Sequence, residues 1–206
     1  MITPFGIRIG RGAAPSPAPV GAELIKTGQT TSYRTGDDGD IEAGRDVSFS
    51  VLPSNNPFGN TNRFTDELGG STYTNNIVID WSTYDGHEVL GYRRTPSASA
   101  VIWNNAIDEA LAVSIGTFTT GWRLTNVREL MNLMNFESGA GWPYRFDYPP
   151  FNITVGDLWS STTMYGITTN AFYYGNVGTS ILYGGKASSF KYIPCRTFTV
   201  TGTTLT

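Results

Sequence analysis

Short stretches in which apolar and polar residues alternate dominate the chain and predict mainly β-strands. Residues 63–66 and 77–81 alternate on either side of Gly69-Gly70, which predicts two strands around a turn. More alternating stretches, separated by turns that contain glycine, lie near the C-terminus. They are residues 158–161, 171–174, 180–183 and 190–200. We expect residues 82–97, which include the only histidine, His87, to form an irregular loop.

Two segments have apolar residues at helical spacing instead. The first helix is predicted from about Trp103 to Ser114, and the second from about Asn126 to Asn135. Asn126 is a suitable N-cap, and Glu129 three residues later completes the pattern of a capping box. Both helices are short and amphipathic, which favours packing against a sheet. The expected buried residues are Ile102, Ala106, Ile107, Ala110 and Leu111 in the first helix, and Val127, Leu130, Met131 and Met134 in the second.

This order of elements predicts an α+β fold, in which the helices are segregated from an antiparallel sheet. A long loop over residues 136–158 joins the second helix to the C-terminal strands. Residues 28–206 are expected to form this domain, and residues 1–27 a separate arm with a proline-rich linker over 10–19. The arm is either a disordered tail or a docking segment that attaches the domain to a larger assembly.

Composition narrows the class of protein. Only 15% of the 206 residues are charged and 13% are aromatic, which favours a β-rich domain over a coiled coil or helical repeat. A net charge of −3 makes a nucleic-acid partner unexpected. Cys195 is the only cysteine, so the chain has no intrachain disulfide. With no apolar run of signal-peptide or membrane-span length, we expect synthesis in a cytosol, no membrane insertion, and release by lysis if the protein acts outside the cell.

Catalytic motifs are missing from the sequence, so we expect a protein that is not an enzyme. It has no nucleophile elbow, phosphate loop or His-Glu-x-x-His pair, and Cys195 in an apparent strand predicts a buried, inert thiol. A pair of carboxylates acting as in glycosidases stays open, because their separation is unreadable from sequence. Asp37, Asp38 and Asp40 are close enough to share a calcium ion, but a polar turn is the favoured interpretation, and no cofactor is expected.

The segment 162–186 has the composition of a binding face. Tyrosine offers a large contact area at low entropic cost, and asparagine and serine offer adaptable hydrogen bonds. About half of the residues in a strand point into the core, and we expect this of Phe172 and of either Tyr173 or Tyr174. The candidate ligand-binding residues are Tyr165, Asn170, Tyr173, Asn176, Tyr183 and Lys186.

Several motifs, taken in order, resemble the domain family named after the C-terminal domain of a Legionella collagen-like adhesin. Residues 121–131 (Gly-Trp-Arg-Leu-Thr-Asn-Val-Arg-Glu-Leu-Met) resemble its WRLPNVKEL motif, and 158–163 (Leu-Trp-Ser-Ser-Thr-Thr) its YWSSTT motif. Residues 27–30 and 35–40 resemble its opening motif. Further matches in the expected order are Arg63, Phe64 and Asp66, the helix start at 103–106, and the closing Cys195-Arg196. The resemblance covers roughly residues 26–200.

The resemblance implies a C-type-lectin-like fold, in which two short helices flank a twisted antiparallel sheet with long loops on one side. Members occur in bacterial surface proteins and phage genomes and are associated with adhesion, including binding of sulfated polysaccharides. Related phage domains bind receptors, and some are diversified in C-terminal strands where residues 162–186 fall. The Glu-Pro-Asn or Gln-Pro-Asp loop and the Trp-Asn-Asp strand of calcium-dependent sugar lectins are absent from this sequence, so calcium-bridged sugar binding is not expected.

These features lead to the hypothesis of a phage virion protein that attaches to a host-surface ligand, either a glycan, which is favoured, or a protein. The expected location is the virion surface, with other virion proteins as partners through the N-terminal arm, and a homotrimer is implied by the resemblance alone. The alternative is a structural capsid-decoration or tail-assembly protein with no receptor role. A further alternative is a bacterial adhesin on the cell surface, exported without a classical signal.

Overall fold

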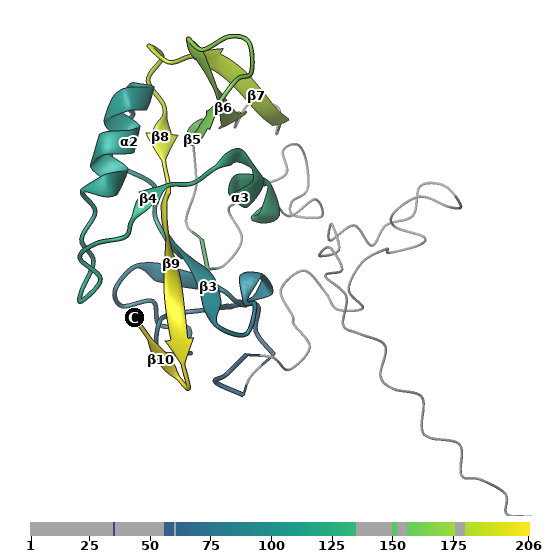
Figure 1. The fold of residues 1–206 in the computed structure, drawn as a ribbon, viewed down its shortest axis with the longest axis vertical. Helices are drawn as coiled ribbons and strands as arrows, with labels where there is room; N and C mark the ends of the chain where they lie inside the picture. The colour runs from purple at the N-terminus through teal and green to yellow at the C-terminus, as the bar shows by residue number, and fades with distance from the viewer. Residues whose placement is uncertain (1–34, 36–55, 60, 135–149, 152–155, 176–179) are drawn as a thin grey trace, which may run out of the picture.

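The computed structural model describes residue 35 and residues 56–59, 61–134, 150–151, 156–175 and 180–206 (Figure 1). Two α-helices and two sheets, of six and four strands, make up this part of the chain, which confirms the expected α+β class. Several sequence predictions lie outside the described residues. They are the arm over 1–27, the acidic residues Asp37, Asp38 and Asp40, the loop residues 136–149, and Asn176.

The six-stranded sheet is entirely antiparallel and occupies the lower half of Figure 1. Its strands are β1 (Phe64–Thr65), β2 (Ile77–Asp80), β3 (Glu88–Arg93), β4 (Arg123–Leu124), β9 (Pro194–Thr201) and β10 (Thr204–Leu205). β1, β2, β3 and β9 follow one another across the sheet. The other edge of β9 pairs with β4 near its beginning and with β10 near its end. β9 therefore pairs with three other strands of this sheet, β3, β4 and β10.

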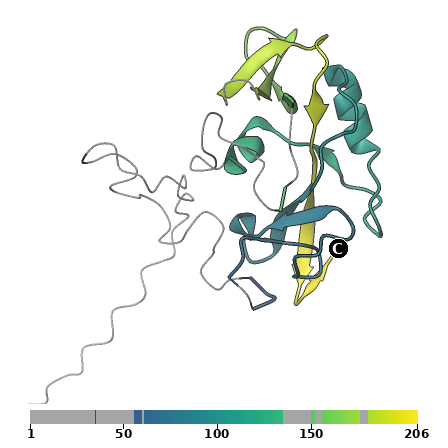
Figure 2. The same cartoon turned by 180° about the vertical axis from the view of Figure 1, so that it is seen from behind.

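The four-stranded sheet lies at the opposite end of the described chain, in the order β7, β6, β5, β8 (Figures 1 and 2). Its strands are β5 (Leu158–Thr163), β6 (Asn170–Gly175), β7 (Ser180–Gly185) and β8 (Lys191–Tyr192). β8 pairs with β5 in parallel, so the expectation of a purely antiparallel sheet is corrected here. Only Ile193 separates β8 from β9, and this short step carries the chain directly from one sheet to the other. The predicted strand over 190–200 is thus two strands.

The irregular loop expected over 82–97 is wrong, because this segment contains β3, a central strand of the larger sheet. A 3-10 helix, η1 (Trp81–Thr83), precedes it. Gly91 in β3 masks the strand pattern, yet the packing requires it: a Cβ there would lie 2.5 Å from the Phe198 ring and 2.8 Å from Ile79. The glycine lowers strand propensity in the sequence while it permits close packing in the fold.

Both helices form where expected, although each buries a somewhat different face. Helix α2 (Trp103–Leu111) buries Ala106 and Ala110 fully and leaves Ile102 and Leu111 exposed, contrary to prediction. Ile102 precedes the first helical turn and Leu111 lies on the flank, because the contact stripe is centred on the two alanines.

Helix α3 (Val127–Asn132) begins with the predicted capping box, since Asn126 and Glu129 each accept backbone N–H groups reciprocally. Leu130, Leu133 and Met134 are buried around it. Met131 is 49% exposed and not part of the buried face, because the stripe that faces the core is rotated toward Leu133.

Helix α3 lies between the two sheets and closes the main hydrophobic core (Figure 1). The core contacts come from α3, from the larger sheet and from the smaller sheet. Representative residues are Leu130 and Leu133 from α3, Val78 and Tyr92 from the larger sheet, and Leu158 and Tyr174 from the smaller one. A second core covers the opposite face of the larger sheet, and a third lies under α2. The smaller sheet is therefore covered by α3 on one face and by α2 on the other.

A fully buried ion pair fixes α3 against the larger sheet. Arg63 Nε and Nη2 donate to the two carboxylate oxygens of Asp80, each at 2.8 Å, and both side chains are inaccessible to solvent. The same Nη2 donates to the main-chain carbonyl of Asn132, at the end of α3, while the Asn132 amide donates to Asp80 at 3.0 Å. Asp80 also accepts the Ser82 N–H and so caps η1. Four of these five contacts are made to the Asp80 carboxylate.

We predict that Asp80→Asn lowers the free energy of unfolding by about 3–5 kcal/mol, because it leaves the Arg63 guanidinium buried without a countercharge. Urea denaturation checks this. Glu88→Gln is the matched control, since it makes the same carboxylate-to-amide change at an exposed position of the neighbouring strand β3. It is expected to change stability by less than about 0.5 kcal/mol. Similar losses in both variants would contradict the assigned role of the buried pair.

Candidate functional site

The predicted binding residues that the structure describes lie on or beside the smaller sheet, and those in its strands are divided between its two faces. Facing residues in an antiparallel pair point to the same side of a sheet. Tyr183 of β7 lies opposite Phe172 of β6, and Asn170, two residues along β6, shares this side. Tyr173 points to the other side with Leu182. The structure therefore does not bring all the candidates together.

The side that carries Asn170, Phe172 and Tyr183 offers an open aromatic surface. Tyr183 is 56% exposed, and Phe172 and Asn170 are half-buried. Phe172 was expected in the core, but the core residue of this side is Tyr174, where the sheet passes beneath α3. Toward Asn170 the strands run out from under the helix, so the rings there remain accessible. We call these three residues together with Tyr165 the aromatic surface.

Tyr165 lies at the tip of the turn between β5 and β6 and is 99% exposed. Backbone hydrogen bonds from Ile167 N–H to the Met164 carbonyl and from Asn170 N–H to the Ile167 carbonyl hold this turn. Gly166 next to Tyr165 has φ +78°, a conformation that favours glycine. The turn thus presents the tyrosine ring on a fixed support, next to the sheet.

Tyr173 and Lys186 are engaged in contacts within the domain. The Tyr173 ring packs edge-on against Trp159, with centroids 5.9 Å apart, and at a tilt against Phe190, with centroids 4.4 Å apart. Lys186 Nζ donates to the Thr163 hydroxyl at 2.9 Å and lies 3.9 Å from the centre of the Trp103 ring. Both residues hold the smaller sheet against α2.

The aromatic surface is electrically neutral. No residue from Leu158 to Gly185 carries a charge, and Asp157 and Lys186 flank the stretch. Exposed apolar side chains lie on it and beside it: Tyr165, Ile167 and Tyr183 are all more than 40% exposed. This uncharged run is a sequence signal that could have pointed to a surface suited to a neutral ligand.

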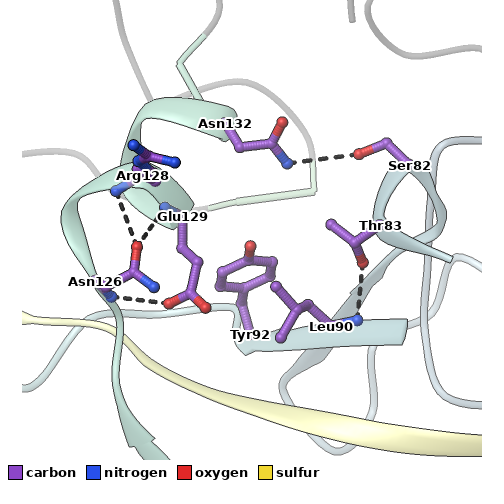
Figure 3. A pocket seen from close by; sticks show the side chains of 8 residues that line it. All are labelled: Ser82, Thr83, Leu90, Tyr92, Asn126, Arg128, Glu129 and Asn132. Carbon is purple, nitrogen blue, oxygen red and sulfur yellow. Dashed lines mark hydrogen bonds between the residues drawn. The ribbon is translucent and has the colours of Figure 1, made fainter. Parts of the chain in front are cut away.

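A second candidate site is a polar recess between α3 and β3, shown in Figure 3. Its volume is about 230 Å³. The lining residues are Ser82, Thr83, Leu90, Tyr92, Asn126, Arg128, Glu129 and Asn132. The contribution of β3 to this recess was not predicted from the sequence, because residues 82–97 were expected to form an irregular loop. The signal that could have found it is the alternation of Leu90 and Tyr92, which places both side chains on one face of a strand.

The Tyr92 hydroxyl is the unusual group of this recess. The residue is completely buried, and its hydroxyl has no hydrogen-bond partner. In Figure 3 the ring rises from β3 and its oxygen points into the space between α3 and Thr83. Leaving a buried hydroxyl unsatisfied costs about 1–3 kcal/mol. Burial raises the pKa of Tyr92 well above its ordinary value, so the group stays protonated and can donate or accept a hydrogen bond.

Glu129 forms one wall of the recess, where Arg123 neutralises its negative charge. Arg123 donates to both of its oxygens, at 2.8 and 2.5 Å, and the Asn126 N–H donates at 2.8 Å. Burial raises the pKa of Glu129, but the hydrogen bonds from Arg123 and Asn126 outweigh it, so the net pKa lies below the ordinary value. The carboxylate is therefore an occupied structural group, unsuited to proton transfer near neutral pH.

Cys195 lies behind Glu129, with its Sγ 3.5 Å from a Glu129 oxygen. The prediction of a buried cysteine is confirmed. Burial, and then the charge of Glu129, raise the pKa of the thiol well above its ordinary value. This environment disfavours the thiolate that nucleophilic chemistry requires.

In the part of the chain that the structure describes, no three His, Cys, Asp or Glu side chains are grouped closely enough to hold a metal ion. The described residues also contain no helix of the length and apolarity needed to cross a membrane. A scan against protein-family models finds no family that matches the sequence, and a search of curated proteins finds no match either.

We predict that Glu129→Gln lowers stability at neutral pH by about 1 kcal/mol, because the amide preserves the capping box but loses the ion pair with the half-exposed Arg123. The folded-state pKa of Glu129 is lowered, so its contribution is present above the unfolded pKa of about 4.3 and is lost as the pH falls through the folded value. The gap between wild type and variant should therefore narrow progressively as the pH falls below about 5 in urea denaturation. A gap that is independent of pH would contradict this assignment.

Proposed function

We propose that this chain is a bacteriophage virion protein with a C-type-lectin-like domain, which binds a neutral glycan on the host surface through the aromatic surface. The observation that carries the proposal is the cross-strand pair of Phe172 and Tyr183, next to Asn170, on an uncharged and accessible part of the smaller sheet. Aromatic rings stack on the apolar faces of sugar rings, and the amide supplies hydrogen bonds. No bond is made or broken in this function.

The roles of the motif residues support the C-type-lectin-like part of the proposal. Trp122 and Leu124 are buried, Asn126 caps α3, and Arg123 pairs with Glu129. Trp159 of the second motif is buried in β5, and Arg63 holds Asp80. The residues that carry the resemblance thus hold the fold together. A likeness in these positions supports a shared fold. The choice of ligand then depends on the residues between the motifs.

Attachment in this proposal depends on many weak sites acting together. A few stacked rings give a modest affinity, and repeated copies on a particle raise the overall avidity by orders of magnitude. In the proposed arrangement residues 1–27 join the domain to other virion proteins, and the aromatic surface faces the host. A homotrimer would satisfy the same requirement for several sites.

A structural virion protein is the second candidate, and the position of β7 favours it. Within the described chain β7 is the outermost strand of its sheet, and it carries no charged residue or proline. Natural proteins commonly protect such an edge with charge or proline, because it can pair with a strand of another molecule. In this alternative β7 and the exposed Leu182 and Tyr183 are covered by a neighbouring subunit.

We predict that Tyr183→Ala and Tyr165→Ala each weaken glycan binding about tenfold, which corresponds to about 1.4 kcal/mol per ring. Binding is measured on an array of purified bacterial surface polysaccharides, with the protein both free and multimerised on beads. Because the surface is neutral, raising the salt from about 50 to about 500 mM should change the affinity little.

Leu68→Ala is the matched control, since it removes an apolar side chain whose exposure of 77% lies between those of Tyr183 and Tyr165, and which lies beyond β1, outside the smaller sheet. It should bind as the wild type does. Equal binding by all variants would place the ligand elsewhere on the domain. A wild-type protein that binds no polysaccharide, even when multimerised, would refute the attachment role and favour the structural candidate.

A further inference from the structure

We propose that the recess between α3 and β3 is a second binding site, which takes one sugar ring bearing a carboxylate, such as a uronic acid. This site is separate from the aromatic surface and its assignment does not depend on the proposed function. Three independent observations support it: an unpartnered buried hydroxyl, a net positive charge, and a size that fits a single ring.

The first observation is the Tyr92 hydroxyl. The Tyr92 ring is completely buried in the main core and packs edge-on against Phe151, with ring centroids 6.2 Å apart, so it has little freedom to turn toward another partner. The hydroxyl lies at the floor of the recess and points into it (Figure 3). A sugar hydroxyl seated above it would complete its hydrogen bonding. Polar groups held ready in this way fix the orientation of a ligand in its site.

The second observation is the balance of charge around the recess. Arg123 neutralises Glu129, and Arg63 neutralises Asp80 beneath Asn132. Arg128 is exposed at the rim, and no acidic residue in the described part of the chain pairs with it. The recess therefore carries one uncompensated positive charge. A guanidinium binds a carboxylate with two parallel hydrogen bonds, which favours an acidic sugar over a neutral one.

The third observation is the size and lining of the recess. Its volume of about 230 Å³ lies below the range of about 300–1,000 Å³ that is usual for drug-sized ligands. One pyranose ring suits such a space. Leu90 gives an apolar wall for the face of the ring. Ser82 accepts only a long contact of 3.5 Å from Asn132, so its hydroxyl can turn toward a ligand.

Other polar groups of the lining, including the Thr83 hydroxyl and the Asn126 side-chain oxygen, are already engaged and hold the walls in place. The Thr83 hydroxyl donates to the Asp80 carbonyl and accepts the Leu90 N–H. The Asn126 side chain accepts the N–H groups of Arg128 and Glu129. We assign the contacts with the ligand to Tyr92, Ser82 and Arg128.

The test is titration of the full chain with D-glucuronate and, in parallel, with D-glucose, followed by two-dimensional amide NMR. We expect saturable binding of glucuronate, with shifts centred on residues 82–92 and 126–132, and at least tenfold weaker binding of glucose. Tyr92→Phe should weaken glucuronate binding at least tenfold. Arg128→Gln should reduce glucuronate binding to the level of glucose. Tyr183→Ala, on the aromatic surface, should leave glucuronate binding unchanged.

Thermal unfolding of Tyr92→Phe provides a readout that does not depend on a ligand. Because the hydroxyl is unpartnered, its removal should leave the melting temperature unchanged or raise it. A clear fall would show that the hydroxyl has a structural partner and would overturn the proposal. It would also be overturned if glucuronate failed to bind saturably up to about 10 mM, or if Arg128→Gln bound both sugars as the wild type does. Because the aromatic surface is tested with other residues and other probes, failure here leaves that test unaffected.

Discussion

The buried carboxylate of Asp80 is the constraint on which the arrangement of this domain depends. It lies in a strand covered on both faces, and it is stable there only because Arg63, Ser82 and Asn132 all donate to it. These donors come from before β1, from η1 and from the end of α3. A charge removed from water is tolerated when it is paired and fully hydrogen-bonded. The position of α3 is therefore coupled to the completion of the β1–β2 pair.

The position of α3 in turn determines both candidate sites. The helix covers Leu158 and Tyr174 on the smaller sheet, and beyond its reach Asn170, Phe172 and Tyr183 remain accessible. Its other flank stands over Leu90 and Tyr92 and forms the wall of the recess. One helix of six residues thus separates a neutral surface suited to stacking from a polar recess with a positive rim. The two surfaces differ in chemistry, so under the proposals above they would contact different parts of a polysaccharide.

Local patterns in the sequence predicted the local structure well. The capping box at Asn126 and Glu129, the alternation in the C-terminal strands and the buried Cys195 were all readable, because each depends on near neighbours or on strand periodicity. β3 could not be predicted from the local sequence, since Gly91 is required by the close approach of Ile79 and Phe198, which are distant from it in sequence. The division of the candidate residues between two faces follows from the register of β6 and β7, which composition does not reveal. The recess was missed for the same reason as β3.

Amide hydrogen exchange, with and without the polysaccharide that the array identifies as the tightest ligand, tests the central claim most directly. That claim is that the smaller sheet, supported by the rest of the fold, is the surface that meets the glycan. We expect slower exchange over residues 164–175 and 180–185, and no change along β9, which belongs to the larger sheet. Protection confined to the larger sheet, or protection nowhere in the domain under saturating ligand, would contradict it.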